Sequence, residues 1–173
     1  MTTEEICERL QKTLKPGRYR HTLRVADTAV SLAERYGYPT DRAYLAGLLH
    51  DCGKSDGDAL THAGIGARLA QEVYGVDDPE ILSAIASHTT GRPEMTLLEK
   101  IIFTADYIEP GRDKAPRLDF LRKKAYEDLD DTILCILEDT LSYLKENGTE
   151  IDERSLQTYT YYYKRKFQRE QGE

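Results

Sequence analysis

Side chains that could bind a metal ion lie at the ends, or on single faces, of predicted helices. They are four histidines and two aspartates: His21, His50, Asp51, His62, His88 and Asp106. Imidazoles and carboxylates are suitable ligands for iron, zinc, manganese or nickel. Asp51 and Asp106 each follow an apolar run, where a carboxylate is costly to bury unless it is paired, protonated or bound to a metal. If several packed helices point these groups at a common centre, they could hold a metal ion there.

The doublet His50–Asp51 also has ordinary explanations. Asp51 could form an ion pair with Lys54 one turn later, because such pairs are common in helices. Any single histidine is more often a core or surface residue than a ligand. Cys52, next to the doublet, is expected to pack as a small buried side chain. The metal hypothesis therefore depends on the six residues acting together.

Composition and charge limit the classes of function. The chain has 173 residues, of which 39% are hydrophobic and 32% charged, and this is typical of one folded domain that spans 1–173. A net charge of −7 argues against broad nucleic-acid binding, whereas a small phosphorylated ligand needs only a local cluster of cations. The three cysteines form no CxxC pair, so neither a disulfide framework nor a zinc ribbon is indicated.

The sequence also predicts a cytoplasmic protein that has no membrane partner. No apolar run approaches the roughly 20 residues that are needed to span a bilayer. The acidic start MTTEEICERL lacks the basic and then apolar layout of a signal peptide.

Helical patterns dominate the chain and predict an all-α fold. Capping-box spacing occurs at Thr2–Glu5 and Thr96–Glu99, and Asp78–Pro79 is a typical helix start. Periodicity and stop signals predict helices over about 2–15, 18–36, 40–51, 62–75, 78–88, 96–109, 118–146 with a break near 128–131, and 152 to the end. Loops are predicted at 54–61 and 89–95. Gly64 and Gly66 are expected to allow close backbone packing within their helix.

The order of these residues resembles a known superfamily. The pattern H…HD…D, formed by His21, His50–Asp51 and Asp106, is similar to the HD-domain metal-dependent phosphohydrolases. The segments RYRHTLRV, GLLHDCGK, HAGIGARLA and AIASHTTGRPEMTLLEKIIFTADYIEPGR resemble the YqeK-type family of symmetrical diadenosine tetraphosphate hydrolases. The resemblance covers Arg18–Arg112, and the block HTTGRPEM…ADYIEPGR is specific to this family, whereas the HD doublet is not.

The resemblance implies an HD-domain helical bundle with a metal centre of iron, either mononuclear or binuclear, or of another divalent transition metal. The implied reaction cleaves diadenosine tetraphosphate, or a related dinucleoside polyphosphate, at its middle into two ADP, with GDP-type products from guanosine analogues. A homodimer is a further expectation.

The resemblance also assigns roles by position. The implied metal ligands are His21, His50, Asp51 and Asp106, with His62 and His88 at a second ion or at the phosphates. The implied catalytic residues are Asp51, Lys54, His62 and His88. The implied nucleotide contacts are Arg18, His21, Lys54, His62, His88, Thr89, Asp106 and Arg112, to which the tail LQTYTYYY adds Thr158 and Tyr159.

These residue types suit the cleavage of a phosphoanhydride. Its negative oxygens repel a nucleophile, and divalent ions neutralise them and activate water. A carboxylate such as Asp51 can bridge two ions with its two oxygens. Lys54 gives a compact charge to a phosphate, and Arg112 gives forked hydrogen bonds. Ordinary surface charge is expected instead for Arg92, Arg20 and Arg24.

Two departures from the family leave substrate contacts open. The link from Lys54 to His62 is short, and the tail reads Thr158–Tyr159–Thr160 where the family often has Thr-Tyr-Asn. Two other functions remain as alternatives. One is another HD-type phosphohydrolase that acts on a nucleoside monophosphate or a guanosine polyphosphate, and the other is a nucleotide-binding regulator without turnover.

Overall fold

The computed structural model describes residues 1–54 and 61–172, and within them all regular structure is helical. The helices are α1 Thr3–Thr13, α2 Pro16–Tyr36, α3 Thr40–Leu49, α4 His62–Glu72, α5 Pro79–Ser87, α6 Leu97–Ile108, α7 Leu118–Lys124, α8 Leu129–Glu146 and α9 Glu153–Glu170. The all-α prediction is therefore confirmed. The predicted loop at 54–61 lies outside the described residues except for Lys54 and Thr61.

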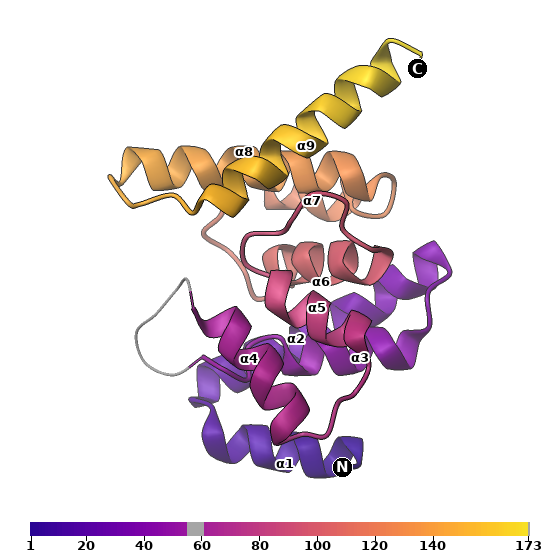
Figure 1. Ribbon diagram of the computed structural model, residues 1–173, viewed down its shortest axis with the longest axis vertical. Coiled ribbons are helices and arrows are strands. Elements are labelled where there is room, and N and C mark those ends of the chain that lie inside the picture. The colour runs from indigo at the N-terminus through magenta and orange to yellow at the C-terminus, as the bar shows by residue number, and fades with distance from the viewer. Residues whose placement is uncertain (55–60, 173) are drawn as a thin grey trace.

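The helices form a lower body and an upper layer (Figure 1). In the body, α2 packs against α3 and α6, and α5 lies among α3, α4 and α6. In the upper layer, α8 packs against α6 and carries α9, whose C-terminal half projects away from the body. The apolar side chains of α2, α3, α5, α6 and α8 form a single buried core.

Polar caps at the helix starts fix where the elements begin. The hydroxyls of Thr2 and Thr96 accept hydrogen bonds from the backbone N–H groups of Glu5 and Glu99, and both glutamates complete a capping box. The carboxylate of Asp128 accepts a hydrogen bond from the backbone of Asp131 and so starts α8, which explains the predicted break. The caps satisfy backbone donors that have no partner inside the helix.

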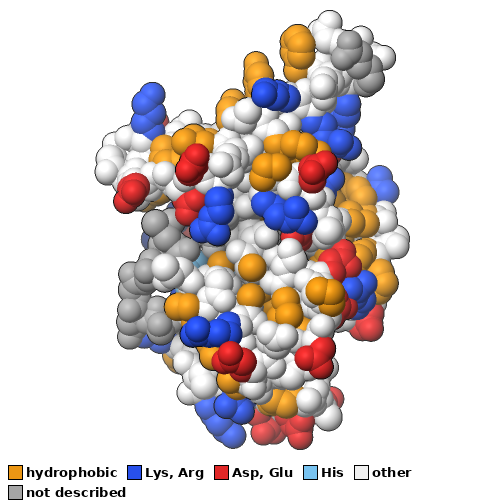
Figure 2. All heavy atoms as spheres, in the orientation of Figure 1, with side chains coloured by type: hydrophobic (Ala, Val, Ile, Leu, Met, Phe, Trp, Pro, Cys, Tyr) orange, Lys and Arg blue, Asp and Glu red, His pale blue; other side chains and the backbone are white. Residues whose placement is uncertain are grey.

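The aromatic and basic tail forms α9, which is held to α8 by ion pairs. Arg165 binds Asp130 at 2.7 Å, and Arg169 binds Asp131 at 3.1 Å. Tyr162 is only 2% exposed, whereas Phe167 is 57% exposed on the projecting half. On the face shown in Figure 2, cationic and anionic side chains are interspersed below this helix.

Glycine allows the turn after α3 to approach α4 closely. A Cβ atom on Gly53 would lie 2.6 Å from the carbonyl oxygen of His62, and it would also contact the backbone of Gly66. The backbone of Gly66 does pack against that of Gly53 as predicted, although a Cβ on Gly66 itself would make only ordinary contacts at 3.4–3.5 Å. The same prediction is wrong for Gly64, because a Cβ there would meet open space.

Within the described residues, no helix has the length and apolar character needed to cross a membrane.

A matched pair of glycine substitutions tests this close approach. We expect Gly53→Ala to lower the free energy of unfolding by about 1–3 kcal/mol, because the added methyl group has no room. Gly64→Ala should instead raise it by about 0.5–1 kcal/mol, because alanine loses less backbone entropy in an exposed helix. Urea unfolding followed by far-UV circular dichroism measures both, and equal stabilities would contradict the packing described.

Candidate metal centre

The six predicted metal-binding side chains converge from five helices. His21 lies in α2, His62 begins α4 and Asp106 lies in α6, whereas His50 and His88 follow the last residues of α3 and α5. All four histidines are buried, and Asp51 is only 1% exposed. The structure therefore brings together residues that are up to 85 positions apart in the sequence, from 21 to 106.

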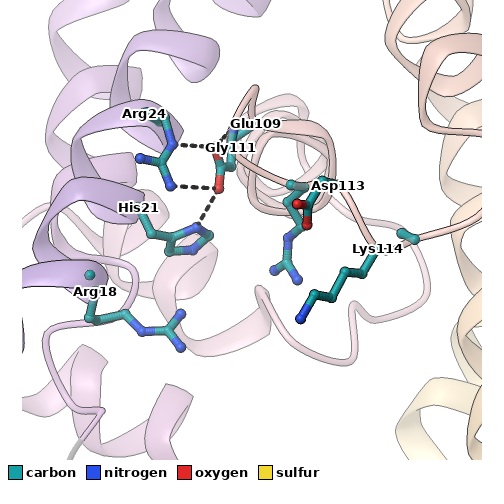
Figure 3. Close-up of a pocket in the computed structure, with 10 residues that line it drawn as sticks. Arg18, His21, Arg24, Glu109, Gly111, Asp113 and Lys114 are labelled. Atoms are coloured by element: carbon teal, nitrogen blue, oxygen red, sulfur yellow. Dashed lines mark hydrogen bonds and ion pairs between the residues drawn. The ribbon is translucent and has the colours of Figure 1, made fainter.

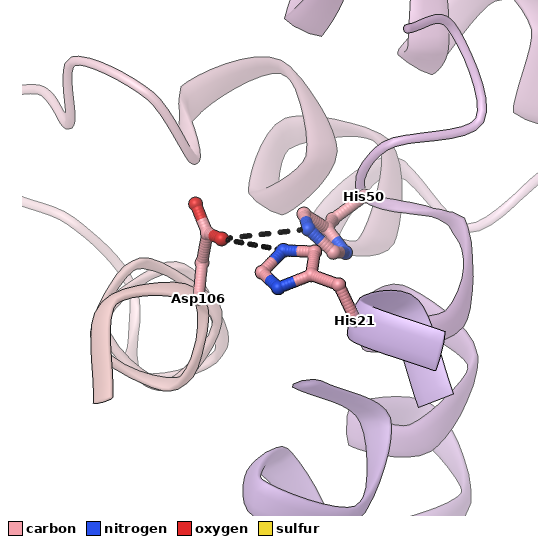
Figure 4. Close-up of side chains that lie close together, drawn as sticks. All are labelled: His21, His50 and Asp106. Carbon is pink, nitrogen blue, oxygen red and sulfur yellow. Dashed lines mark ion pairs between the residues drawn. The ribbon is translucent and has the colours of Figure 1, made fainter. Parts of the chain in front are cut away.

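One oxygen of Asp51 faces the first group of donors. Its Oδ2 atom lies 3.5 Å from His50 Nε2 and 3.8 Å from His21 Nε2. Asp106 Oδ1 lies 3.0 Å from His21 Nε2 and 3.6 Å from His50 Nε2 (Figure 4). These four residues present two nitrogens and two oxygens to one small volume.

The other oxygen of Asp51 faces a second group. Its Oδ1 atom lies 3.5 Å from His62 Nε2 and 3.4 Å from His88 Nε2. The two Nε2 atoms are 3.1 Å apart, and the hydroxyl of Thr89 lies 3.3 Å from each of them. Asp51 thus stands between two donor groups, one on each of its oxygens.

The donor set fits a bound metal. Ligands about 2.1 Å from an ion, at angles of about 90–110°, are roughly 3.0–3.4 Å from one another. Most of the separations around Asp51 are close to this range. The Nε2 atoms of His21 and His50 are buried without a hydrogen-bond partner, which is costly unless an ion satisfies them. The two groups His21, His50, Asp106 and His50, Asp51, His88 each have ligand atoms close enough to share one ion.

Helix ends set the ring orientation of two histidines. His50 Nδ1 donates to the carbonyl oxygen of Gly47 at 2.6 Å, and His88 Nδ1 donates to that of Ile85 at 2.7 Å. Carbonyl groups in the last turn of a helix have no partner within the helix, so an imidazole at the helix end can satisfy them. Because the proton sits on Nδ1, the Nε2 lone pair of each neutral ring is free for a metal.

Glu109 orients the third histidine, His21. Its Oε1 atom accepts a hydrogen bond from His21 Nδ1 at 3.0 Å, and its Oε2 atom accepts one from Arg24 at 2.6 Å. Burial alone would raise the pKa of Glu109, but hydrogen bonds from Arg24, His21 and the backbone of Gly111 lower the pKa to about 2. Glu109 is therefore ionised at neutral pH and keeps the proton of His21 on Nδ1.

Both aspartates of the centre are ionised. Burial would raise the pKa of Asp51, but the facing imidazoles of His50 and His88 hold it below its usual range. The imidazoles of His21 and His50, which face Asp106, likewise hold the pKa of this carboxyl well below its usual range against a similar cost of burial. Arginines complete the surroundings: Arg18 binds Asp51 at 2.8 Å and Arg112 binds Asp106 at 3.2 Å.

The structure does not support the ordinary explanations for the His50–Asp51 doublet. Among residues 1–54 and 61–172, the carboxylate of Asp51 pairs with Arg18 and imidazoles, and no carboxylate lies within 4.0 Å of the Lys54 ammonium. Cys52 is turned away, because its thiol donates to the carbonyl oxygen of Gly66 at 3.2 Å. Burial raises the pKa of this thiol to about 12, so it stays protonated.

Two cavities open beside the centre. One, of about 260 Å³, is reached by Lys54, His62, His88, Thr89, Asp106 and Arg112, and its far wall is formed by Phe103, Tyr107, Ile136, Leu137, Thr140, Leu141 and Ser155. Because its aromatic and aliphatic wall would suit the base of a nucleoside, we call it the nucleoside cavity. The other, of about 310 Å³, is reached by His21 and Arg112 and is shown in Figure 3. We call it the cationic cavity.

Several predicted contacts lie elsewhere. Thr158 is fully buried, its hydroxyl donates to the carbonyl oxygen of Arg154, and it lines neither cavity. The ring of Tyr159 lies next to that of Tyr163, and Tyr159 also lines neither cavity. Nucleotide contacts from Thr158 and Tyr159 therefore stay predictions. Arg92 binds the buried carboxylate of Glu99 at 2.8 Å and so has a structural partner, although its side chain is 42% exposed as expected.

Glu109 was not among the residues predicted for the site, and the expectation of ordinary surface charge for Arg24 is wrong, because Arg24 binds the buried carboxylate of Glu109. Glu109 follows Asp106 by three residues, a spacing that places both on one helix face. This spacing could have indicated from the sequence that Glu109 lies near the site. Arg24 follows His21 by the same spacing in α2.

The fold and this centre define an HD-domain protein, a class of metal-dependent phosphohydrolase, and residues 18–111 match the HD-domain family. The chain is 39% identical to the symmetrical bis(5'-nucleosyl)-tetraphosphatase of Halalkalibacterium halodurans over 163 residues, which cover 82% of this chain and 87% of the relative. It is 36% identical to the protein of the same name from Bacillus subtilis, over 93% of this chain and 97% of the relative. This chain therefore belongs to the family of the symmetrical bis(5'-nucleosyl)-tetraphosphatases.

A solved structure agrees with this assignment. The crystal structure of a Clostridium acetobutylicum protein, described as a predicted HD superfamily hydrolase involved in NAD metabolism, matches with a TM-score of 0.89 at 38% identity. The match covers 95% of this chain and 98% of that chain, so the likeness includes α7, α8 and α9 beyond the HD domain.

Glu109→Gln tests the role of the buried carboxylate. We expect the affinity for Mn²⁺ or Fe²⁺ to fall about 10–100-fold, because His21 loses the ionised acceptor that orients its ring. Competition with a chelating dye measures this affinity, and circular dichroism checks that the helices persist. Asp113→Asn removes the same charge from an exposed neighbour and should change the affinity less than about twofold. If Glu109→Gln binds the metal as tightly as the wild type does, Glu109 does not orient His21 for metal binding.

Proposed function

We propose that this protein hydrolyses diadenosine tetraphosphate, and related dinucleoside polyphosphates, symmetrically into two nucleoside diphosphates. The observation that carries the proposal is the placement of Asp51, whose two oxygens face two groups of imidazole and carboxylate donors. The relatives from H. halodurans and B. subtilis, which carry the name of this activity, match over most of the chain and support it.

We assign a binuclear metal centre, and we propose iron as the metal. His21, His50 and Asp106 would hold one ion together with Asp51, while His62 and His88 would hold the second with the other oxygen of Asp51. Imidazoles and carboxylates suit iron, and they also suit manganese, zinc and nickel. Bound metal ions would supply charge neutralisation on the phosphates and activation of a water molecule.

The residues around the centre would bind and orient the substrate. Lys54, with no carboxylate partner among the described residues, and Arg112 at the rim of both cavities would hold phosphate oxygens by charge-assisted hydrogen bonds. Tyr107, Phe103 and Leu137 of the nucleoside cavity would pack against one nucleoside, because they form an apolar wall that an aromatic base can cover.

The overall reaction is hydrolysis of the central phosphoanhydride bond of the substrate. The oxygen of a water molecule forms a bond to one of the two central phosphorus atoms and the water gives up a proton to the solvent, while the central phosphoanhydride bond breaks and the oxygen of the departing ADP takes up a proton from the solvent. Within this proposal, residues 1–173 act as one domain in the cytoplasm, and a homodimer stays a prediction.

Product analysis tests the proposed reaction. The protein should be purified anaerobically, its metal content measured by elemental analysis, and diadenosine tetraphosphate added. We expect ADP as the only nucleotide product, with activity lost on metal removal and restored by Fe²⁺ or Mn²⁺. Formation of ATP with AMP, release of free phosphate, or full activity in metal-free protein would each contradict the proposal. Iron as the native metal requires about one or two iron atoms per chain in the purified protein.

Substitution of the shared ligands tests the assignment of the centre. Asp51→Ala and Asp106→Asn should each lose bound metal and lower kcat more than about 100-fold, because an ion loses a direct ligand. The far-UV helical signal should persist, since neither carboxylate is part of the apolar core that holds the helices together. Asp119→Asn, whose side chain is 99% exposed, is the control with the same loss of charge. Metal content equal to that of the wild type in both variants would refute the assignment.

A further inference from the structure

The cationic cavity has no role in the function proposed so far. It is lined by His21 of the centre, whereas the nucleoside cavity is lined by His62, His88 and Asp106. Four cations line it, namely Arg18, Arg24, Arg112 and Lys114, and they face two carboxylates, those of Glu109 and Asp113. Two further carboxylates, those of Asp51 and Asp106, pair with Arg18 and Arg112 from outside this lining. A metal ion bound by these two aspartates, as proposed above, would leave the cations of the cavity in excess.

The cations of the cavity differ in whether they have a partner. The guanidinium groups of Arg18, Arg24 and Arg112 each bind a carboxylate, at 2.8, 2.6 and 3.2 Å respectively. Among the described residues, no carboxylate lies within 4.0 Å of the Lys114 ammonium. Figure 3 shows the Lys114 side chain extending into the open space of the cavity, toward the side where Arg18 lies.

The beginning of α2 adds to the positive character of the cavity. Gly17, in the first turn of α2, forms part of the wall, and a Cβ there would meet open space. The helix starts at Pro16 with no side-chain hydrogen bond at its cap, and no acidic residue lies in its first turn. A helix start of this kind favours an anion, and it complements the four cations.

The two cavities meet at the metal centre. Arg112 lines both, and its Nη2 atom binds Asp106, which in turn lies 3.0 Å from His21. A symmetric substrate whose central phosphates lie at the centre has two equal halves that must leave it in different directions. The nucleoside cavity accepts one half, and the cationic cavity is the space next to His21 for the other.

We propose that the cationic cavity is a second nucleotide subsite, in which Lys114 and the start of α2 bind the diphosphate of the other half of the substrate. This inference rests on the proposed function. The lining explains the class of ligand, because charged side chains, Gly17, Gly111 and Ala115 offer no aromatic or large apolar wall for a base. The cavity binds phosphates, and the second nucleoside extends toward solvent.

With a subsite of this kind, the protein contacts both halves of the substrate. With one nucleoside held in the nucleoside cavity and the far diphosphate held by Lys114, the central bond lies at the metal centre. The site then distinguishes a dinucleoside tetraphosphate from a mononucleotide through the second diphosphate, by charge and not by base contacts.

Binding and kinetics of Lys114 variants test the proposal. Metal-loaded wild-type protein should bind two ADP per chain in isothermal titration calorimetry, and Lys114→Glu should bind one. Lys114→Ala should raise the KM for diadenosine tetraphosphate by about tenfold, as expected for the loss of one charge-assisted hydrogen bond, with a smaller change in kcat. Lys145→Ala removes an exposed cation that lines neither cavity and should leave both measurements unchanged.

The outcomes separate this inference from the proposed function. One ADP per chain in the wild type, or a KM in Lys114→Ala equal to that of the wild type, would overturn the second subsite even if two ADP are formed in turnover. A failure of the wild type to produce ADP from diadenosine tetraphosphate would instead overturn the proposed function, because ADP binding is measured without turnover.

Discussion

A buried carboxylate among imidazoles is the constraint on which the rest of this structure depends. Asp51 is 1% exposed, and both of its oxygens face histidine nitrogens. An ionised carboxylate in such a place is tolerated only when charges and hydrogen bonds compensate for its lost hydration. Arg18 supplies part of that compensation, and the two donor groups leave room for cations to supply the remainder. The same groups that make the burial possible therefore form the metal centre.

The fold positions these groups mainly through helix ends and close backbone contacts. His50 and His88 lie where α3 and α5 end, so each ring donates a hydrogen bond to a carbonyl group that the helix leaves without a partner. Gly53 lets the turn after α3 approach α4 and so brings His62 to the centre. Glu109, fixed by Arg24, orients His21 from the end of α6. Hydrogen bonds at these helix ends thereby leave the Nε2 atoms of His50 and His88 facing Asp51.

The two cavities give the centre two chemically different sides. On one side, aromatic and aliphatic residues of α6 and α8 form a wall that suits a base. On the other side, cations and the start of α2 suit phosphate. A substrate with two identical halves would thus be bound by unlike contacts at its two ends. The asymmetry follows from topology, because a single chain offers different helices to the two sides of its metal centre.

The sequence by itself determined the helices, their caps and the types of residue at the centre. Capping pairs such as Thr96 and Glu99 are local signals, and so is Gly37, which follows the last residue of α2 in a left-handed conformation. The hydrogen bonds that these residues make join positions only a few residues apart. The predicted set of six metal-binding residues could also be recognised from residue type and order. Tertiary structure alone decided that Asp51 divides its oxygens between two groups, that Glu109 and Arg24 hold His21, and that Thr158 is buried away from both cavities. These features depend on distances between helices that are far apart in the chain, and helix packing, not residue spacing, sets such distances.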